Sequence, residues 1–281
     1  MYGTFSIVAV NPYTGEVGSA GASCIAGSII ISDVHPGYGA IHTQSYWHSG
    51  NQNLAMNYMN LGYSPEQIID SLVINDIQNN PGVRQYGVVD LVNNGRSSAF
   101  TGENCYDYKG HITGQAYSIQ GNILLGEEVI QQIEYNFLNT NGSFSEKLMS
   151  ALQGANIPGA DTRCIENGNS SLSAFIRIAN PNDSSDDLFL DLNINNVSIG
   201  IEPIDLLQDQ FTNWNNQQPE ILNGDVNNDG FINITDILLM VSNITACNNL
   251  SVASLYSADL NNDSNLNIQD IMIILNIILG N

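Results

Sequence analysis

Thr4 combines a reactive side chain with a position near the start of the chain, where it follows Gly3 and opens the apolar stretch 5–10. If the peptide bond between Gly3 and Thr4 is cleaved, Thr4 carries a hydroxyl nucleophile and, in its own α-amino group, a base. An α-amino group has a pKa of about 7.7–8.0, so a useful fraction of it accepts protons at neutral pH. A threonine at the edge of a strand is also an ordinary β-former that points to solvent. Thr4 is therefore a candidate catalytic residue whose role depends on the rest of the chain.

A second chemical pattern is a twelve-residue segment that occurs twice, at 225–236 and at 259–270, with an offset of 34 residues. Oxygen-bearing side chains fall at loop positions 1, 3, 5, 9 and 12 of both copies, and position 7 offers a backbone carbonyl. The candidate ligands are Asp225, Asn227, Asp229, Phe231, Asn233 and Asp236, followed by Asp259, Asn261, Asp263, Asn265, Asn267 and Asp270. Ca²⁺ takes six to eight oxygens, and this spacing wraps the chain once around such an ion.

The alternative for these segments is a pair of Asn/Asp-rich turns that bind nothing, but two aligned copies favour binding. We therefore expect two Ca²⁺ sites. The second copy has Ser264 where the sharp turn of such a loop prefers glycine, so its site should be the weaker one.

The charge of the chain supports a cation-binding role. Six Lys and Arg residues stand against 28 Asp and Glu residues, which gives a net charge of −22, and all six cations precede residue 180. Such a field repels phosphate backbones and anionic lipids, which argues against nucleic-acid and membrane-surface partners. No apolar run of about 18 residues indicates a membrane span, and no signal peptide precedes the first strand pattern, so either a leader has been removed or the protein is cytoplasmic.

The spacing of the four cysteines, Cys24, Cys105, Cys164 and Cys247, excludes a zinc knuckle. Two alternatives remain open, which are one disulfide among the first three in an oxidising compartment, or buried free thiols.

Alternating and helical patterns predict the elements that would position these residues. Strands are expected at 4–10, 17–24, 28–34, 38–45, 84–92, 97–101, 111–119, 171–178 and 188–194, and helices at 51–61, 64–75, 127–138, 145–153 and 204–214. Because strands and pairs of helices come in blocks, a sheet pair between helical layers fits better than a doubly wound parallel sheet. The polar stretch before Pro219 marks a boundary, which gives a first domain at 1–214, a linker at 215–223 and a module at 224–281.

The repeat and the apolar helix pattern after each copy resemble a dockerin type I module, a small all-α, EF-hand-like pair of calcium loops. The resemblance implies calcium-dependent docking onto a cohesin-like or other surface scaffold protein, and an extracellular or cell-surface location if a signal peptide is missing from this sequence. Such modules often belong to bacterial polysaccharide degraders. Thr235 and Gln269, next to loop position 12, differ from the Ser-Thr pair of cellulosomal dockerins, so the docking partner stays open.

The first domain resembles the domain of unknown function 1028 family, which is grouped with the N-terminal nucleophile (Ntn) hydrolases. The resemblance rests on residues 4–9, 14–18, 43–44, 84–90, 101–102, 121–124 and 159–163. It implies a four-layer αββα Ntn-hydrolase-like sandwich within an α+β fold. It also implies that removal of residues 1–3 by self-cleavage activates Thr4 as the nucleophile.

The same resemblance suggests roles for residues around Thr4. Ser23 and Asn122 are candidate oxyanion-hole donors. Since no lysine lies on an early strand, Arg84 and Arg163 could supply the positive field, although Arg163 and its neighbour Asp161 are as easily a structural ion pair.

Two further residues, His42 and Gln44, could line a pocket, but a lone histidine at a strand end is more often structural. Cys164 stands where the family usually has glycine, and it could close a disulfide to Cys24.

These observations favour a secreted Ntn-type amidohydrolase or peptidase that acts on an unknown amide-containing substrate and is attached through its dockerin. The alternative is a non-catalytic extracellular adhesion or scaffold subunit that keeps the αββα fold with residues 1–3 in place. A third option is an enzyme whose site the sequence does not reveal. A homo-oligomer is left open.

Overall fold

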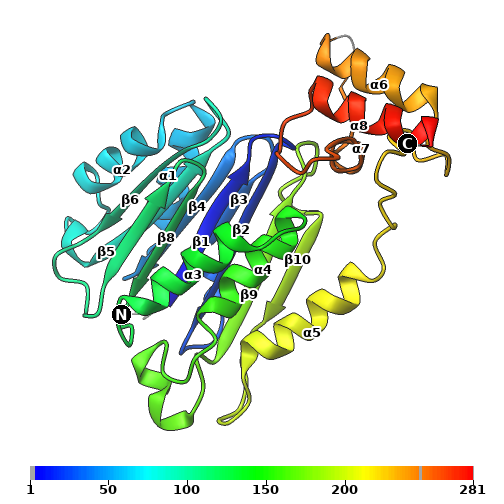
Figure 1. Cartoon of the computed structure of the whole chain (residues 1–281). Coiled ribbons are helices and arrows are strands. Elements are labelled where there is room, and N and C mark those ends of the chain that lie inside the picture. The colour runs from blue at the N-terminus through cyan, green and yellow to red at the C-terminus, as the bar shows by residue number, and fades with distance from the viewer. Residues whose placement is uncertain (1–3, 247–248, 281) are drawn as a thin grey trace. The chain divides into compact units, whose positions relative to one another are not determined.

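The computed structural model describes residues 4–246 and 249–280, and the chain forms two compact units that divide between Asn216 and Gln217 (Figure 1). Residues 1–3, whose removal the sequence analysis expects, and Cys247 lie outside the described residues. The strands of the first unit are β1 (Thr4–Asn11), β2 (Glu16–Ser23), β3 (Ser32–His35), β4 (Gly39–Ser45), β5 (Arg84–Asp90), β6 (Arg96–Thr101), β7 (Gly110–Gly114), β8 (Tyr117–Asn122), β9 (Ser173–Ala179) and β10 (Leu190–Ile194). Its helices are α1 (Ser49–Asn60), α2 (Pro65–Ile74), α3 (Glu128–Asn139), α4 (Phe144–Gly154) and α5 (Pro203–Asn215), with short 3₁₀ turns η1 (Ser28–Ile31), η2 (Pro81–Val83) and η3 (Thr162–Asn167).

The strands form two antiparallel sheets. One has six strands in the order β10-β9-β2-β1-β8-β7, and the other has four in the order β3-β4-β5-β6. Because β1 lies between β2 and β8, residues at its start have neighbours on both sides, and Thr4 is paired directly opposite Asn122. The predicted α+β class with antiparallel strands is confirmed.

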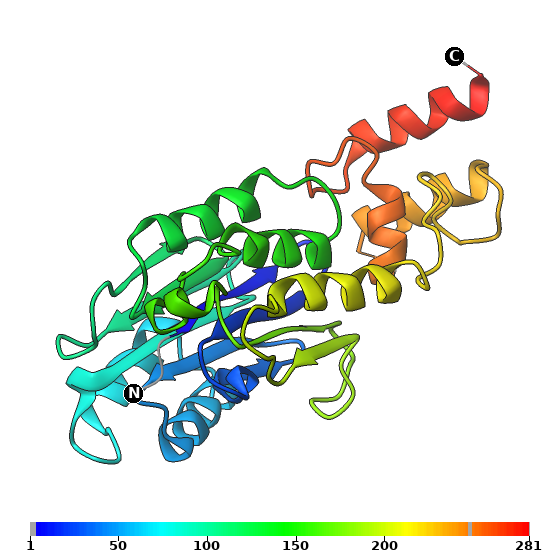
Figure 2. The ribbon, with the colours of Figure 1, turned by 90° about the horizontal axis from the view of Figure 1, so that it is seen from below.

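Three apolar clusters show how these layers pack. Phe5 and Ile7 of β1 pack with side chains of α3, α4 and α5, whereas Ile41 and Val88 of the smaller sheet pack with α1 and α2. Val8 of β1 belongs to a third cluster that also contains residues of β3, β4 and β5, so it lies between the two sheets. Figure 2 shows the helices α3, α4 and α5 on one side of the strands and α1 and α2 on the other.

Side chains alternate along β1, which decides what each of its residues faces. Odd-numbered residues point to the helices and even-numbered residues point to the other sheet. The sequence predicts this alternation only for the apolar members.

The glycines of β2 make room for side chains of α4 and of the neighbouring strands β1 and β9. A Cβ added to Gly18 would lie 2.2 Å from Leu148 Cδ1 and 2.8 Å from Phe144 Cε1. A Cβ at Gly21 would lie 2.9 Å from Ser6 Cβ. Helix packing therefore explains the lack of bulk at Gly18.

Two strand predictions are wrong in detail. The stretch predicted as one strand at 28–34 begins as the 3₁₀ turn η1, and only Ser32–His35 pairs in a sheet. The stretch 111–119 is not one strand but parts of a hairpin formed by β7 and β8, because the chain reverses at Gln115 and Ala116 without an Asn-Gly signal.

Helix starts follow their sequence signals closely. Ser64 and Gln67 form a capping box at the start of α2, and Ser143 and Glu146 form one at the start of α4.

The second unit holds α6 (Ile234–Ile244), α7 (Val252–Ala258) and α8 (Ile268–Leu279). A small core joins the helices and consists of Val226, Ile237, Met240, Ala258 and Ile274. Its helical content agrees with the predicted all-α module. Among the described residues of the whole chain, no helix is both long and apolar enough to span a membrane.

Candidate functional site

The candidate nucleophile Thr4 begins β1, and its side chain is on the face directed toward the second sheet. Thr4 is 1% exposed in the chain that retains residues 1–3. Its Oγ1 donates a long hydrogen bond to Ser23 Oγ, at 3.4 Å, from the end of the neighbouring strand β2. The structure therefore brings together two residues that are 19 positions apart in sequence.

An ion pair is joined to Thr4 through Ser23. Arg163 Nη2 donates to Ser23 Oγ at 3.3 Å, while its Nε and Nη2 bind the carboxylate of Asp161 at 2.9 and 2.6 Å. Asp161 is fully buried and also accepts a hydrogen bond from the backbone N–H of Cys24, at 2.9 Å. Arg163 and Asp161 thus serve as a structural pair, and the same pair places a guanidinium beside the candidate site.

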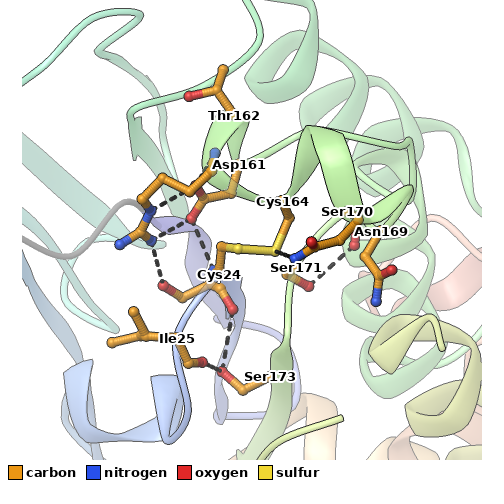
Figure 3. Close-up of a disulfide and its surroundings, with 12 residues drawn as sticks. Cys24, Ile25, Asp161, Thr162, Cys164, Asn169, Ser170, Ser171 and Ser173 are labelled. Atoms are coloured by element: carbon orange, nitrogen blue, oxygen red, sulfur yellow. Dashed lines mark hydrogen bonds and ion pairs between the residues drawn. A yellow bond between two sulfur atoms is a disulfide. The ribbon is translucent and has the colours of Figure 1, made fainter. Parts of the chain in front are cut away.

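A disulfide connects the two segments that carry these residues. Cys24, at the end of β2, is bonded to Cys164 in the turn η3, which confirms the pairing suggested by the family resemblance. Figure 3 shows Asp161 and Cys164 in one turn above Cys24. Below Cys24, Ser173 Oγ donates to the backbone carbonyl of Ile25. Of the cysteines among the described residues, Cys105 is free and buried.

Three amide side chains form a second group next to Thr4. Gln44 Nε2 donates to the carbonyl oxygen of Thr4 at 3.4 Å and to Gln85 Oε1 at 2.8 Å. Asn122 Nδ2 also donates to Gln85 Oε1, at 2.9 Å. One of the two N–H groups of Asn122 Nδ2 is thus engaged with Gln85, and its role as an oxyanion donor stays a prediction.

His42 lies deeper between the sheets. It is fully buried, with Nε2 at 2.5 Å from Ser19 Oγ and Nδ1 at 2.9 Å from Ser6 Oγ. Burial, with a smaller contribution from the charge of Arg177, lowers the pKa of His42 to about 3, so the ring is neutral at physiological pH. Ser6 connects it to the amide group, because Ser6 Oγ donates to Gln44 Oε1 at 2.7 Å.

Arg84 is engaged in a different set of interactions. Its guanidinium binds Asp76 at 2.7 Å, Gln78 at 2.9 Å and the backbone carbonyl of Tyr46. Burial would raise the pKa of Asp76, but hydrogen bonds led by that from Arg84 outweigh it and hold the pKa below its ordinary value. Arg84 therefore fixes the start of β5 to the loop after α2, while Arg163 is the arginine joined to Thr4 through Ser23.

The sequence analysis did not single out Ser6, Gln85 and Gln120. Gln120 Nε2 donates to Ser6 Oγ at 2.7 Å, and a Cβ on Gly87 would lie 2.0 Å from Gln120 Oε1, so glycine is needed where the sheets approach. The available signal was polar residues at alternate positions of otherwise apolar strands, as in Ser118, Gln120 and Asn122 of β8.

The two predicted calcium loops are wound by matching hydrogen bonds. In the first, Asp225 accepts from the N–H groups of Asp229 at 3.0 Å and Gly230 at 2.7 Å. In the second, Asp259 accepts from Asp263 at 3.1 Å and Ser264 at 2.8 Å. The carboxylates at position 12, Asp236 and Asp270, are fully buried and cap α6 and α8 through capping boxes with Asn233 and Asn267.

The donor set of each loop suits a hard cation. No Lys or Arg occurs after residue 179 to neutralise these carboxylates, and Ca²⁺ prefers oxygen ligands. Within the part of the chain that the structure describes, no three His, Cys, Asp or Glu side chains converge on one point. A cation in these loops therefore needs amide and backbone oxygens in addition to the carboxylates.

Two family models match the chain, one on each side of the boundary between its two compact units. The model of a family of unknown function, DUF1028, matches residues 4–204, and the model of the dockerin type I domain matches residues 223–279. The crystal structure of protein SPO2555 from Silicibacter pomeroyi, described as a DUF1028 protein, covers 75% of this chain and 88% of its own length, with a TM-score of 0.63 and 23% identity. At this identity the likeness shows the fold alone. No curated protein matches the chain.

Proposed function

Since this chain belongs to the family of unknown function DUF1028 and carries a dockerin type I domain, we propose that its first unit is an Ntn-type amidohydrolase with Thr4 as nucleophile. Dockerin type I domains bind calcium and imply a cohesin partner on an extracellular scaffold. The layering of helices, two antiparallel sheets and helices supports an αββα Ntn-hydrolase-like sandwich. The observation that carries the proposal is the position of the Thr4 hydroxyl, at the start of a central strand and hydrogen-bonded to Ser23.

The proposed reaction begins once residues 1–3 have been removed. Thr4 Oγ1 attacks the carbonyl carbon of an amide, and the hydroxyl proton passes to the Thr4 α-amine. The amine then gives that proton to the leaving nitrogen as the C–N bond breaks, which leaves an ester on Thr4. Water, deprotonated by the same amine, attacks the ester, and the acid product leaves as the Thr4 hydroxyl is restored.

The surroundings of Thr4 fit these steps in two ways. Ser23 contacts Oγ1, and the guanidinium of Arg163 donates to Ser23, so positive charge lies near Oγ1 and favours the loss of its proton during attack. Gln44 binds the Thr4 carbonyl, which restrains the backbone of the nucleophile. Removal of residues 1–3 must also open access to Oγ1, because Thr4 is 1% exposed while they are attached.

Intact mass and N-terminal sequencing of the secreted protein test the proposal first, and a mature chain that begins at Thr4 is expected. That protein should hydrolyse members of an amide panel, and Thr4→Ala should abolish hydrolysis while the melting temperature stays that of a folded protein. Thr113→Ala, which changes an exposed threonine of β7, is the matched control and should keep full activity.

The alternative is a non-catalytic adhesion or scaffold subunit, and the burial of Thr4 favours it. A homogeneous folded chain that retains residues 1–3, together with no turnover on the panel, would establish this alternative and exclude Thr4 catalysis.

For the second unit we propose two Ca²⁺ sites of unequal affinity. Ser264 adopts a φ of 59°, in the left-handed region that glycine at the matching Gly230 occupies without strain at 86°. The strain at Ser264 supports weaker binding by the second loop.

A further inference from the structure

Asn122 presents a buried oxygen without a hydrogen-bond donor beside the candidate nucleophile. Asn122 is fully buried at the end of β8, directly opposite Thr4, and no partner for its Oδ1 exists among the described residues. A buried acceptor left unpaired destabilises the folded chain, because it has lost its bonds to water. A hydrogen-bond donor that reaches Asn122 Oδ1 would therefore stabilise the site.

The orientation of the Asn122 amide follows from the hydrogen-bond directions around Gln85. Gln85 Nε2, with two N–H groups, lies within hydrogen-bond distance of three oxygens, which are Thr101 Oγ1 at 2.9 Å, Gly110 O at 3.1 Å and Gly121 O at 2.8 Å. Its Oε1 must then face the other way, where it accepts from Gln44 and Asn122. Since only a nitrogen can donate to Gln85 Oε1, Asn122 Nδ2 is fixed on that side and Oδ1 is left over.

Opposed residues of an antiparallel pair point to the same face, with Cβ atoms about 4.5–5.5 Å apart. Asn122 and Thr4 are such a pair, and both side chains are on the face toward the second sheet. A peptide N–H at Thr4 offers one donor, whereas the α-ammonium group made by removal of residues 1–3 offers three.

We propose that Asn122 Oδ1 accepts a hydrogen bond from the freed α-amino group of Thr4 and orients it toward Oγ1. The inference rests on the proposed function and gives Asn122 a positioning role in place of that of an oxyanion donor. The N-terminal residue is then held at three atoms, with Oγ1 bound by Ser23, the carbonyl oxygen by Gln44 and the amine by Asn122. The charged groups joined to Thr4 through Ser23 are Arg163 and Asp161, which pair with each other.

The test uses the full chain released from a cleavable fusion so that it begins at Thr4, with ¹³C-labelled threonine. The shift of Thr4 Cβ against pH reports the pKa of the amine and requires no turnover. Asn122→Asp should raise that pKa by about one unit or more, because a carboxylate within 4–6 Å favours the ammonium form. Asn122→Ala should lower it, because the bond to the charged form is lost. Asn139→Asp, at the exposed end of α3, is the charge-matched control and should leave it unchanged.

An amine pKa that is the same in the folded wild-type, Asn122→Asp and Asn122→Ala proteins would overturn the inference. If neither variant folds, a crystal structure of the Thr4-initiated wild type decides. A nitrogen of Thr4 within 2.7–3.2 Å of Asn122 Oδ1 supports the role, and an Oδ1 bound only to water or to another group refutes it. Hydrolysis of the amide panel is measured on the same sample, so loss of catalysis and loss of amine positioning are read separately.

Discussion

His42 shows how a residue with catalytic potential can be committed to the structure. Its ring is fully buried and held by Ser6, Ser19 and Gln120. Gln120 donates to Nδ1 if that atom is unprotonated, and Nε2–H then donates to Ser19, which in turn donates to Ser32. In this neutral arrangement each ring nitrogen of His42 has a hydrogen-bond partner.

The low pKa of His42 predicts a specific loss of stability in mild acid. The unfolded chain binds a proton near pH 6.5, whereas the folded chain does so only near pH 3, so stability falls as pH drops through this window. Between pH 6.5 and 5 the wild type should lose about 2 kcal/mol, as an order of magnitude, at up to about 1.4 kcal/mol per pH unit. Urea unfolding in saturating calcium measures this loss.

The matched variant is His42→Gln, which keeps hydrogen-bonding groups but does not titrate. It should be less stable than wild type at pH 7 and show a much flatter profile between pH 6.5 and 5. Equal slopes for the two proteins would rule out the neutral buried state of His42.

At the scale of elements, the two calcium loops provide a matched pair of changes. Ser264→Gly should tighten the second site by about five- to thirtyfold, because a non-glycine residue in the left-handed region costs roughly 1–2 kcal/mol. Gly230→Ser should weaken the first site by a similar factor. Calorimetric titration of the two variants and the wild type checks both changes.

Opposite shifts at the two loops are required for this explanation. If Ser264→Gly left both affinities unchanged, backbone strain at loop position 6 would not be what separates the sites.

Local signals predicted the elements that depend on local physics. Ser64, Pro65 and Gln67 specify the start of α2, and Asn93, Asn94 and Gly95 specify the turn between β5 and β6. The reversal at Gln115 and Ala116 was missed because it carries no such signal, and its formation depends on the pairing of β8 with β1. Strand pairing is set by partners far away in sequence.

The same limit applies to the candidate site, where the sequence indicates individual residues but not the contacts between distant strands. Thr4 stands out by its position, and the pair Asp161 and Arg163 by adjacency, but the direction of each amide around Gln85 depends on strands β4, β5 and β8 meeting. Gly87 illustrates the limit, because its role is to admit Gln120 from the opposite sheet, and neither residue indicates the other in the sequence.

At the scale of the whole molecule, the two units are stabilised by different means. The first unit has extended apolar clusters on both sides of its sheets and a disulfide that spans 140 residues. The second has a small core and buried carboxylates at Asp236 and Asp270 with no cationic side chain of its own. We expect bound calcium to add to the stability of this small unit, since a ligand at about 1,000 times its Kd contributes about 4 kcal/mol per site.

This difference predicts two separable thermal transitions in the full chain. Chelation of calcium with EDTA should abolish the transition of the second unit, because its unpaired carboxylates then repel one another. The transition of the first unit should stay within about 2 °C of its original temperature. A reductant should lower the transition temperature of the first unit and leave that of the second unchanged. Opening a disulfide loop of 140 residues reduces the free energy of unfolding by about 5 kcal/mol according to the chain-entropy argument, and by about 2–4 kcal/mol in typical measurements. Differential scanning calorimetry, with Asp225→Ala plus Asp259→Ala as the calcium control and Cys24→Ser plus Cys164→Ser as the disulfide control, assigns each transition. A single transition that moves with both treatments would show that the units unfold together, and the calcium loops would then contribute to the stability of the Thr4 site.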